Sequence, residues 1–141
     1  VFLFGNIKFG IGSLREECRS TWANYLSKWL DAYKAHGIEM WAVTVQNEPS
    51  NSPSWEGCVF EPVAEADFLG NFLGPLLHEK HPGLKIFAGD DQTKTRLAEW
   101  ASTIYAHPAA SKYAYGLSFH WYGDADVQFI EGVHREFPQS I

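Results

Sequence analysis

Two periods of apolar residues alternate along the chain, one typical of helices and the other of buried strands. Between residues 21 and 36, apolar side chains recur at spacings of three and four, which predicts an amphipathic helix. Ser20 or Thr21 can cap the start of this helix, and His36-Gly37 is a stop signal. Its predicted apolar face consists of Trp22, Tyr25, Leu26, Trp29, Leu30 and Tyr33.

The next apolar run, residues 40–46, is short and rich in β-branched residues, which predicts a strand buried on both faces. It ends in Asn47-Glu48-Pro49, and Pro49 cannot extend the ladder because it lacks an N–H donor. Glu48 is therefore expected at the carboxyl end of a parallel strand, where barrels and open α/β sheets keep catalytic residues. The alternative is a loop glutamate beside a turn proline.

The remainder of the chain repeats strand and helix patterns. The expected elements are a helix over 63–80 with a kink at Gly74-Pro75, a strand over 84–89, a helix over 94–106, a helical turn after Pro108, a strand over 116–119 and a helix over 127–137. The two later strands end in Asp90-Asp91-Gln92 and in His120-Trp121-Tyr122. Such alternation predicts a parallel sheet, and the lack of a glycine-rich phosphate loop favours a barrel over a nucleotide-binding open sheet.

Composition adds constraints on the class of partner. Aromatic residues make up 16% of the 141 residues, so some are expected to line a site, for which stacking on an apolar sugar face is one common use, although all of them could pack in the core. The formal charge is −6 and no basic stripe is present, which argues against a nucleic-acid partner. Cys18 and Cys58 match no zinc or redox spacing, and two free thiols are preferred over a disulfide.

The chain carries no apolar run of membrane-spanning length. The apolar stretch at its start is too short for a signal peptide and lacks the basic flank that such a peptide carries. There is no initiator Met, so we expect an internal piece of a longer protein.

Several short motifs occur in order over residues 12–141. They are Gly12-Ser13-Leu14, Thr21-Trp22-Ala23, Leu30-Asp31-Ala32-Tyr33, Trp41-Ala42-Val43-Thr44, Asn47-Glu48-Pro49, Leu73-Gly74-Pro75, Asp90-Asp91-Gln92, Trp100-Ala101, Ala110-x-Lys112-Tyr113 and His120-Trp121-Tyr122. Together they resemble glycoside hydrolase family 30, and within it the glucosylceramidase branch of acid β-glucosidases. Residues 1–11 do not fit this pattern and are expected to be a divergent or wrongly joined segment, with 12–141 a fragment of the catalytic barrel.

The resemblance implies an α/β fold, a partial TIM (β/α)8 barrel containing approximately strands 4 to 6 with their helices. It implies a retaining β-glycosidase, in which two carboxylates work about 5–5.5 Å apart. Glu48 is then the catalytic acid/base, and the nucleophile is a second glutamate beyond the end of this chain. No metal and no organic cofactor is implied, and the fragment alone is expected to be inactive.

The remaining site residues are assigned to substrate binding. Asn47 is expected to bond the sugar 2-hydroxyl, with a turn amide as the alternative. His120 and Tyr122 are expected near the two carboxylates, where they could set their protonation. Trp121 either walls the pocket or packs, and Gln92 is a further polar contact. Asp90 and Asp91 are taken as structural or sugar-side groups, and Glu131 and Glu136 as solvated surface charges on the last helix.

The expected reaction is hydrolysis of glucosylceramide to glucose and ceramide. One alternative is another enzyme of the family acting on β-glucan or xylan, because Val45-Gln46 before Asn47 occurs in microbial-type sequences. Another is a catalytically inactive barrel fragment. The expected partners are a glycolipid or β-glucoside substrate and a membrane surface or lipid-activator protein. The resemblance implies a lysosomal or secreted location.

Overall fold

The computed structural model of the protein describes residues 3–6, 11–51, 57–91, 94–120 and 127–139. The elements in chain order are β1 (Leu3–Asn6), β2 (Ile11–Leu14), η2 (Glu16–Cys18), α1 (Arg19–Ala35), β3 (Ala42–Thr44), α2 (Pro62–Phe68), η3 (Leu69–Leu73), α3 (Gly74–Lys80), β4 (Lys85–Asp91), α4 (Lys94–Ala106), η4 (Ala110–Lys112), β5 (Ala114–Phe119) and α5 (Val127–Glu136).

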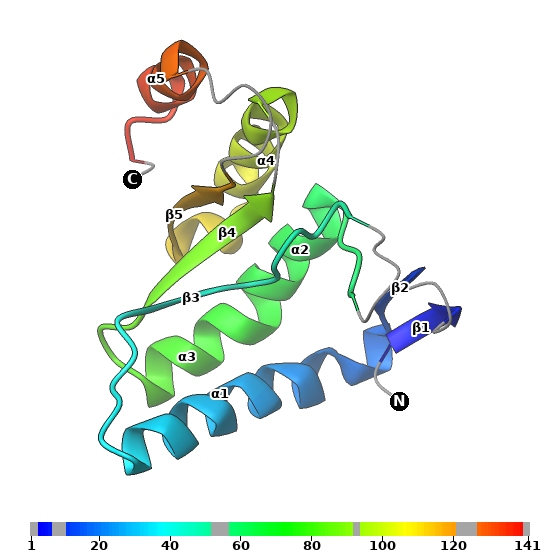
Figure 1. Ribbon diagram of the computed structural model, residues 1–141, viewed down its shortest axis with the longest axis vertical. Helices are drawn as coiled ribbons and strands as arrows, with labels where there is room; N and C mark the ends of the chain where they lie inside the picture. Colours follow the sequence, from blue (N-terminus) through cyan, green and yellow to red (C-terminus); the bar gives the residue numbers. More distant parts are fainter. Residues whose placement is uncertain (1–2, 7–10, 52–56, 92–93, 121–126, 140–141) are drawn as a thin grey trace.

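Three strands form a parallel sheet in the order β3-β4-β5, and a helical segment separates each strand from the next (Figure 1). Thr44 pairs with Phe87, and Ala88 pairs with Leu117. Parallel strands require crossover connections of this kind. The predicted α/β class and the predicted strand and helix order after residue 40 are therefore confirmed.

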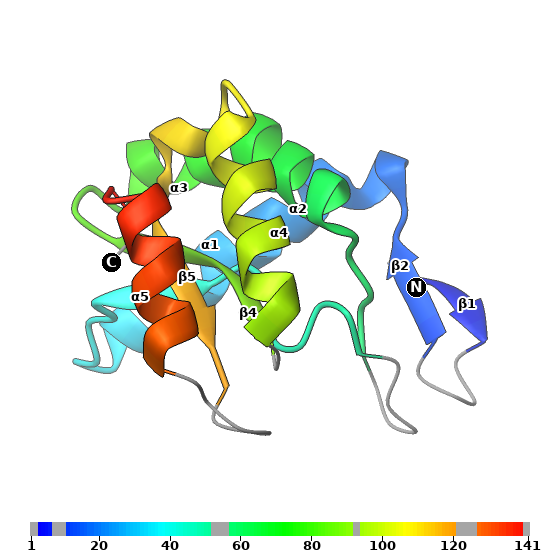
Figure 2. The same cartoon turned by 90° about the horizontal axis from the view of Figure 1, so that it is seen from above.

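The continuous helical run of α2, η3 and α3 covers one face of this sheet together with α4, which packs against α2; α1 lies next to α3 and α5 next to α4 (Figure 2). Ile86, Ala88 and Leu117 point to this face and are buried. Trp100 of α4 and Phe68 of α2 are fully buried, and Trp100 lies close against Gly89 of β4. The opposite face carries an aromatic cluster of Trp41, Phe87 and Tyr115, whose rings contact one another.

Strand β3 departs from the sequence expectation. A strand is present where the sequence predicted one, but β3 spans Ala42–Thr44 instead of 40–46, and the expected burial on both faces was wrong because Trp41 is 65% exposed. Within the described residues β3 has one neighbour, β4, so only the side chains that face the helices are covered. The ladder does continue one residue further, because the N–H of Val45 donates to the carbonyl of Phe87 at 3.0 Å.

The helix predicted over 63–80 is present, and it is interrupted where the sequence placed the kink. Residues Leu69–Leu73 form a π-helical turn between α2 and α3, and the N–H of Gly74 bonds to the carbonyl of Leu69. Pro75 has no N–H to donate and its ring crowds the preceding turn, so the wider turn accommodates it. The predicted disturbance at Gly74-Pro75 is thus confirmed, in the form of a π turn.

The antiparallel pair β1–β2 was not predicted. Leu3 pairs with Leu14 and Asn6 with Ile11. Ser13 also forms a parallel bridge with Val59, where the N–H of Val59 donates to the carbonyl of Gly12 at 2.6 Å. This bridge ties the loop that follows Glu48 to the start of the chain. None of the helices in the described ranges is long and apolar enough to cross a membrane.

Candidate functional site

Glu48 follows β3 in an unusual backbone conformation. Its φ of 46° makes it the only non-glycine residue with positive φ in the described part of the chain. Its N–H donates to the carbonyl of Asp90 at 2.7 Å, and its carbonyl accepts the N–H of Asn51 at 2.9 Å. The next residue, Pro49, is fully buried. Neighbouring groups thus hold Glu48 in a conformation that costs free energy, which is a frequent property of functional positions.

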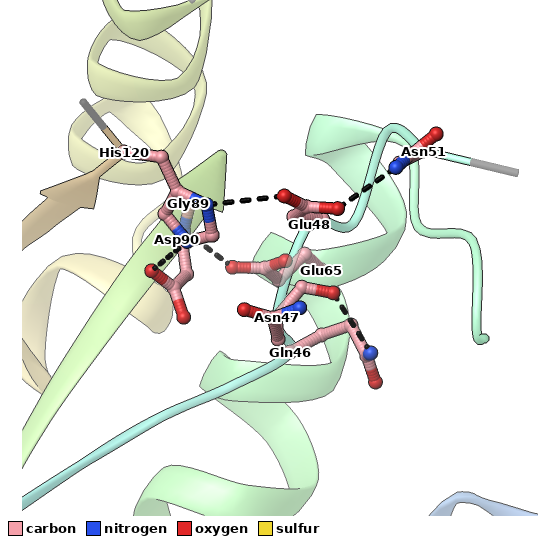
Figure 3. Close-up of polar contacts among 8 residues, drawn as sticks. All are labelled: Gln46, Asn47, Glu48, Asn51, Glu65, Gly89, Asp90 and His120. Atoms are coloured by element: carbon pink, nitrogen blue, oxygen red, sulfur yellow. Dashed lines mark hydrogen bonds and ion pairs between the residues drawn. The ribbon is translucent and has the colours of Figure 1, made fainter. Parts of the chain in front are cut away.

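Both oxygens of the Glu48 carboxyl group have polar partners (Figure 3). Oε1 lies 3.1 Å from Nδ1 of His120, and Oε2 accepts a hydrogen bond from Nδ2 of Asn51 at 2.8 Å. The Glu48 side chain remains 13% exposed. The carboxyl group is therefore oriented by fixed neighbours and still reachable from solvent, as an acid/base group needs to be.

His120 joins Glu48 to a second carboxylate. Its Nε2 lies 3.2 Å from Oδ1 of Asp90, while its Nδ1 faces Glu48. Asp90 lies on β4, and His120 directly follows β5. The polar side chains that leave the carboxyl ends of β3, β4 and β5 thus meet in one network, at the edge of the sheet where parallel α/β folds place their sites.

The backbone of β4 is irregular where it approaches this network. The pairing of β4 with β5 shifts register between Ala88 and Asp91, and Gly89 has a φ of +60°. The N–H of Gly89 donates to Oε1 of Glu65 at 2.8 Å instead of continuing the ladder. A Cβ at Gly89 would lie 3.1 Å from the Cβ and Cγ of Trp100. Glycine is required here both for the positive φ and for the close approach of Trp100.

The structure places three of the predicted site residues. Glu48 and His120 come together, and Asn47 is exposed in the same turn, where its carbonyl accepts a hydrogen bond from Nε2 of Gln46 at 3.0 Å. The other three, Gln92, Trp121 and Tyr122, lie outside the described residues.

The sequence did not point to Asn51 and Glu65 as members of the site network. Asp90 was expected as a structural or sugar-side group at the end of the strand next to that of Glu48, and it lies beside His120. Asn51 follows Glu48 by three residues in a turn, a spacing that allows side-chain contact. Glu65 lies among the buried residues of α2, and a charged residue on an apolar helix face is itself a signal.

The two cysteines are free, as predicted. Burial raises the pKa of the Cys58 thiol to about 11, and the nearby Glu65 carboxylate contributes to the rise, while a backbone hydrogen bond at Leu14 opposes it. Cys58 therefore remains protonated at neutral pH and is a poor nucleophile.

Two surface hollows lie at the end of the strands that is opposite to the Glu48 network. His81, Gly83 and Leu84 line both of them, and neither is lined by Glu48, Asp90 or His120. They border the amino ends of the strands. In barrels, the residues at this end usually serve stability rather than catalysis. Within the described ranges, no cluster of His, Cys, Asp and Glu side chains is suited to hold a metal ion.

Comparisons with known proteins agree with this geometry. The family model of the glycosyl hydrolase family 30 TIM-barrel domain matches residues 6–141. Lysosomal acid glucosylceramidase of Mus musculus is 36% identical over an alignment that covers 94% of this chain and 28% of the mouse protein. Endo-1,6-beta-D-glucanase of Neurospora crassa is 33% identical, with 72% of this chain and 22% of the fungal protein covered.

Solved structures give the same result. SrfJ from Salmonella typhimurium superposes with a TM-score of 0.86 and 32% identity, covering 96% of this chain and 30% of SrfJ. The endo-beta1,6-glucanase BT3312 superposes with a TM-score of 0.87 and 29% identity, covering 97% of this chain and 31% of that enzyme. The predicted partial TIM barrel is confirmed, and the chain spans less than a third of the length of these relatives.

Proposed function

The chain belongs to glycosyl hydrolase family 30, and from this premise we propose that it supplies Glu48 as the acid/base of a retaining β-glycosidase. The observation that carries the proposal is the strained, hydrogen-bonded position of Glu48 at the end of β3, with His120 on its carboxyl group. In the first step Glu48 protonates the leaving oxygen. In the second it takes a proton from the water that hydrolyses the glycosyl-enzyme.

The nucleophile of this mechanism is a second carboxylate about 5–5.5 Å from the first. No other glutamate follows the carboxyl end of β3, β4 or β5 in the described part of the chain, and Asp90 is engaged with His120. We therefore assign the nucleophile to a glutamate elsewhere in the whole protein, and we expect residues 1–141 alone to show no useful turnover.

The substrate-binding groups are part of the same proposal. Asn47, next to Glu48 and exposed, is proposed to bond the sugar 2-hydroxyl, an interaction that strengthens in the transition state. His120 is proposed to control the proton on Glu48. Gln92, Trp121 and Tyr122 are proposed as further contacts to the sugar, on the basis of their positions in the sequence after β4 and β5.

For the substrate we propose glucosylceramide, cleaved to glucose and ceramide. The support is the similarity to the mouse lysosomal acid glucosylceramidase and to a putative glucosylceramidase of Caenorhabditis elegans at 37% identity. A lysosomal or secreted location, near a membrane surface or a lipid-activator protein, belongs to the same proposal. The second candidate is a β-1,6-glucan, favoured by the similarity to endo-1,6-glucanases.

The acid/base role is tested with Glu48→Gln in the whole protein. Turnover of a substrate with a poor leaving group should fall far more than turnover of an activated aryl β-glucoside, because the aryl group leaves with little protonation. Added azide should restore turnover of the aryl substrate by attacking the glycosyl-enzyme without base help. The exposed Glu79 of α3 provides a matched control as Glu79→Gln. Equal losses on both substrates without azide rescue would show that Glu48 is structural.

The substrate class is tested separately. The wild-type whole protein is assayed on glucosylceramide in mixed micelles and on soluble β-1,6-glucan at matched concentrations of glycosidic bonds. A higher kcat/KM for glucosylceramide supports the first candidate. A higher value for the glucan replaces it with the second and leaves the role of Glu48 intact.

A further inference from the structure

Glu65 is a fully buried carboxyl group behind the candidate site. It lies on α2, where Ala66 and Phe68 are also fully buried. Burial of a carboxyl group costs free energy unless hydrogen bonds compensate, so its presence in the helix layer calls for a specific role. Its Oε1 accepts the N–H of Gly89 at 2.8 Å (Figure 3).

This hydrogen bond secures the irregular part of β4. Gly89 lies within the register shift of β4, and its N–H bonds to a side chain rather than to a neighbouring strand; a buried N–H without a partner would cost about 1–3 kcal/mol. Glu65 supplies the missing acceptor. A bulge that is held in this way changes the direction of the next side chain, and bulges are common beside active sites for that reason. The next residue is Asp90.

Asp90 holds Glu48 in two ways. Its carbonyl accepts the N–H of Glu48 at 2.7 Å, which fixes the backbone of the turn. Its carboxylate lies 3.2 Å from Nε2 of His120, whose Nδ1 lies 3.1 Å from the Glu48 carboxyl group. The position of Glu48 therefore depends on where the bulge places Asp90.

The same contacts favour one tautomer of the His120 ring. An ionised Asp90 only accepts hydrogen bonds, so it favours the ring form that carries the proton on Nε2. In a neutral ring Nδ1 is then an acceptor, and it favours a proton on Oε1 of Glu48. Because the Asn51 amide donates to Oε2, the proton of the acid form belongs on Oε1. The network thus matches the form of Glu48 that a general acid needs.

We propose that Glu65 is a positioning residue for the acid/base, holding the Gly89–Asp90 bulge so that Asp90 and His120 keep Glu48 oriented and protonated. The inference rests on the proposed role of Glu48. The bond from the Gly89 N–H to Glu65 reaches the Glu48 carboxyl group through Asp90 and His120, so we assign the effect of Glu65 to this chain of contacts.

The test compares three replacements of Glu65 in the whole protein. Glu65→Gln keeps the acceptor for the Gly89 N–H and should keep kcat within about threefold. Glu65→Leu removes the acceptor, and Glu65→Asp withdraws it by about 1.5 Å, one C–C bond length. Both should lower kcat roughly 10–100-fold, because small misplacements at a catalytic group have effects of that size. Glu65→Asp keeps the charge, so it tests the loss of the acceptor even if Glu65→Leu fails to fold.

The pH profile separates positioning from general destabilisation. The alkaline limb of kcat/KM reports ionisation of the general acid. When Asp90 no longer fixes the Nε2 proton, Nδ1 of His120 can carry the proton and donate to Glu48, which favours the carboxylate. The limb should therefore move to lower pH, by roughly one unit, in Glu65→Leu, Glu65→Asp and Asp90→Asn. Phe68→Leu, on the same helix, should lower stability and leave the limb in place.

Two further results decide the inference. The double variant Glu65→Asp/Asp90→Asn should lose little more kcat than its worse single parent, since the two residues act in one chain of contacts. Wild-type kcat and an unmoved limb in Glu65→Asp would overturn the proposal. Glu48→Gln tells failure of this inference from failure of the proposed function. If Glu48→Gln abolishes the alkaline limb, the acid/base role of Glu48 stands; if the limb persists, the proposed function itself is wrong.

Discussion

At the scale of single residues, the conformation of Glu48 has a measurable consequence for stability. A side chain at φ 46° crowds the backbone, and a left-handed residue other than glycine costs about 1–2 kcal/mol. Glu48→Gly and Glu48→Ala both delete the carboxylate and its bonds to His120 and Asn51, but only glycine relieves the crowding. After the larger unfolded-state entropy of glycine is subtracted, the glycine variant should be more stable than the alanine variant by about 0.5–1 kcal/mol.

The measurement is chemical denaturation of the two variants of the whole protein under identical conditions. Using a pair that lacks the carboxylate in both members removes the hydrogen bonds from the comparison. An alanine variant as stable as the glycine variant would mean that the turn relaxes without Glu48, and that its backbone is not held under strain.

The second prediction at this scale concerns Cys58 and alkaline pH. The folded state raises the pKa of this thiol from 9.0 to about 11, so the folded state holds the proton more tightly than the unfolded state. The stabilisation is complete below pH 9 and is lost as the pH rises toward 11. Between these pH values the free energy of unfolding of the wild-type protein should decrease. In the Cys58→Ala variant this decrease with pH should be smaller.

Thiol labelling gives an independent check of the same prediction. At pH 8 an alkylating reagent should modify the half-buried Cys18 well before the buried Cys58, which should react at the rate of local unfolding. Equal labelling rates for the two thiols in the folded protein would contradict the assigned burial of Cys58.

The sequence predicted the location of a residue where that location depends only on the end of its own strand. Glu48 and His120 follow short apolar runs, and parallel strands bring such ends to one edge. The contact between Asp90 and His120 could not be predicted, because it depends on a bulge whose register only pairing with β5 defines. The bond from Gly89 to Glu65 joins residues 24 positions apart and has no local signature.

At the scale of elements, two glycines should respond in opposite directions to the same change. Gly89 has φ +60° and a Cβ there would meet Trp100 at 3.1 Å, whereas a Cβ at Gly132 of α5 would meet nothing within 4 Å. Gly89→Ala should destabilise the whole protein by about 1–3 kcal/mol, through backbone strain and the shift forced on Trp100. Gly132→Ala should stabilise it by about 0.5–1 kcal/mol, because alanine is the better helix former.

Denaturation curves of both variants check this pair, and kcat adds a second readout. Gly89→Ala should also lower kcat, since the bulge presents Asp90, while Gly132→Ala should not. If Gly89→Ala retained both stability and kcat, the bulge at Gly89 would be incidental to the site.

The hydrophobic periods predicted the elements well, because a helix face and a strand run each leave a local pattern. The predicted helix over 94–106 coincides with α4, and the first helix begins and ends within two residues of α1. The β1–β2 pair escaped prediction since it spans four residues on each strand, too few for a period. The exposure of Trp41 escaped it because burial depends on which strands flank β3.

At the scale of the whole molecule, the sheet is covered unequally. The helices bury the face of Ile86 and Ala88, while Trp41, Phe87 and Tyr115 form an aromatic cluster on the other face, with ring centroids 5.5–6.1 Å apart. Within a closed barrel that face is the interior and is filled by side chains from all strands. The period of apolar residues identifies the strands but not this difference between faces, because a parallel strand is apolar on both.

The aromatic cluster predicts how residues 1–141 behave when produced alone. With Trp41 65% exposed and the β3 and β5 edges available for pairing, the 15.9 kDa chain should self-associate in a concentration-dependent manner. Size-exclusion chromatography with light scattering over a dilution series provides the measurement. Trp41→Ser should shift the population toward monomer, because it removes the most exposed ring of the cluster. Val63→Ser, at a position 69% exposed on α2, should not. A monomer that persists across the series and unfolds in one sharp transition would show that the aromatic face needs no cover.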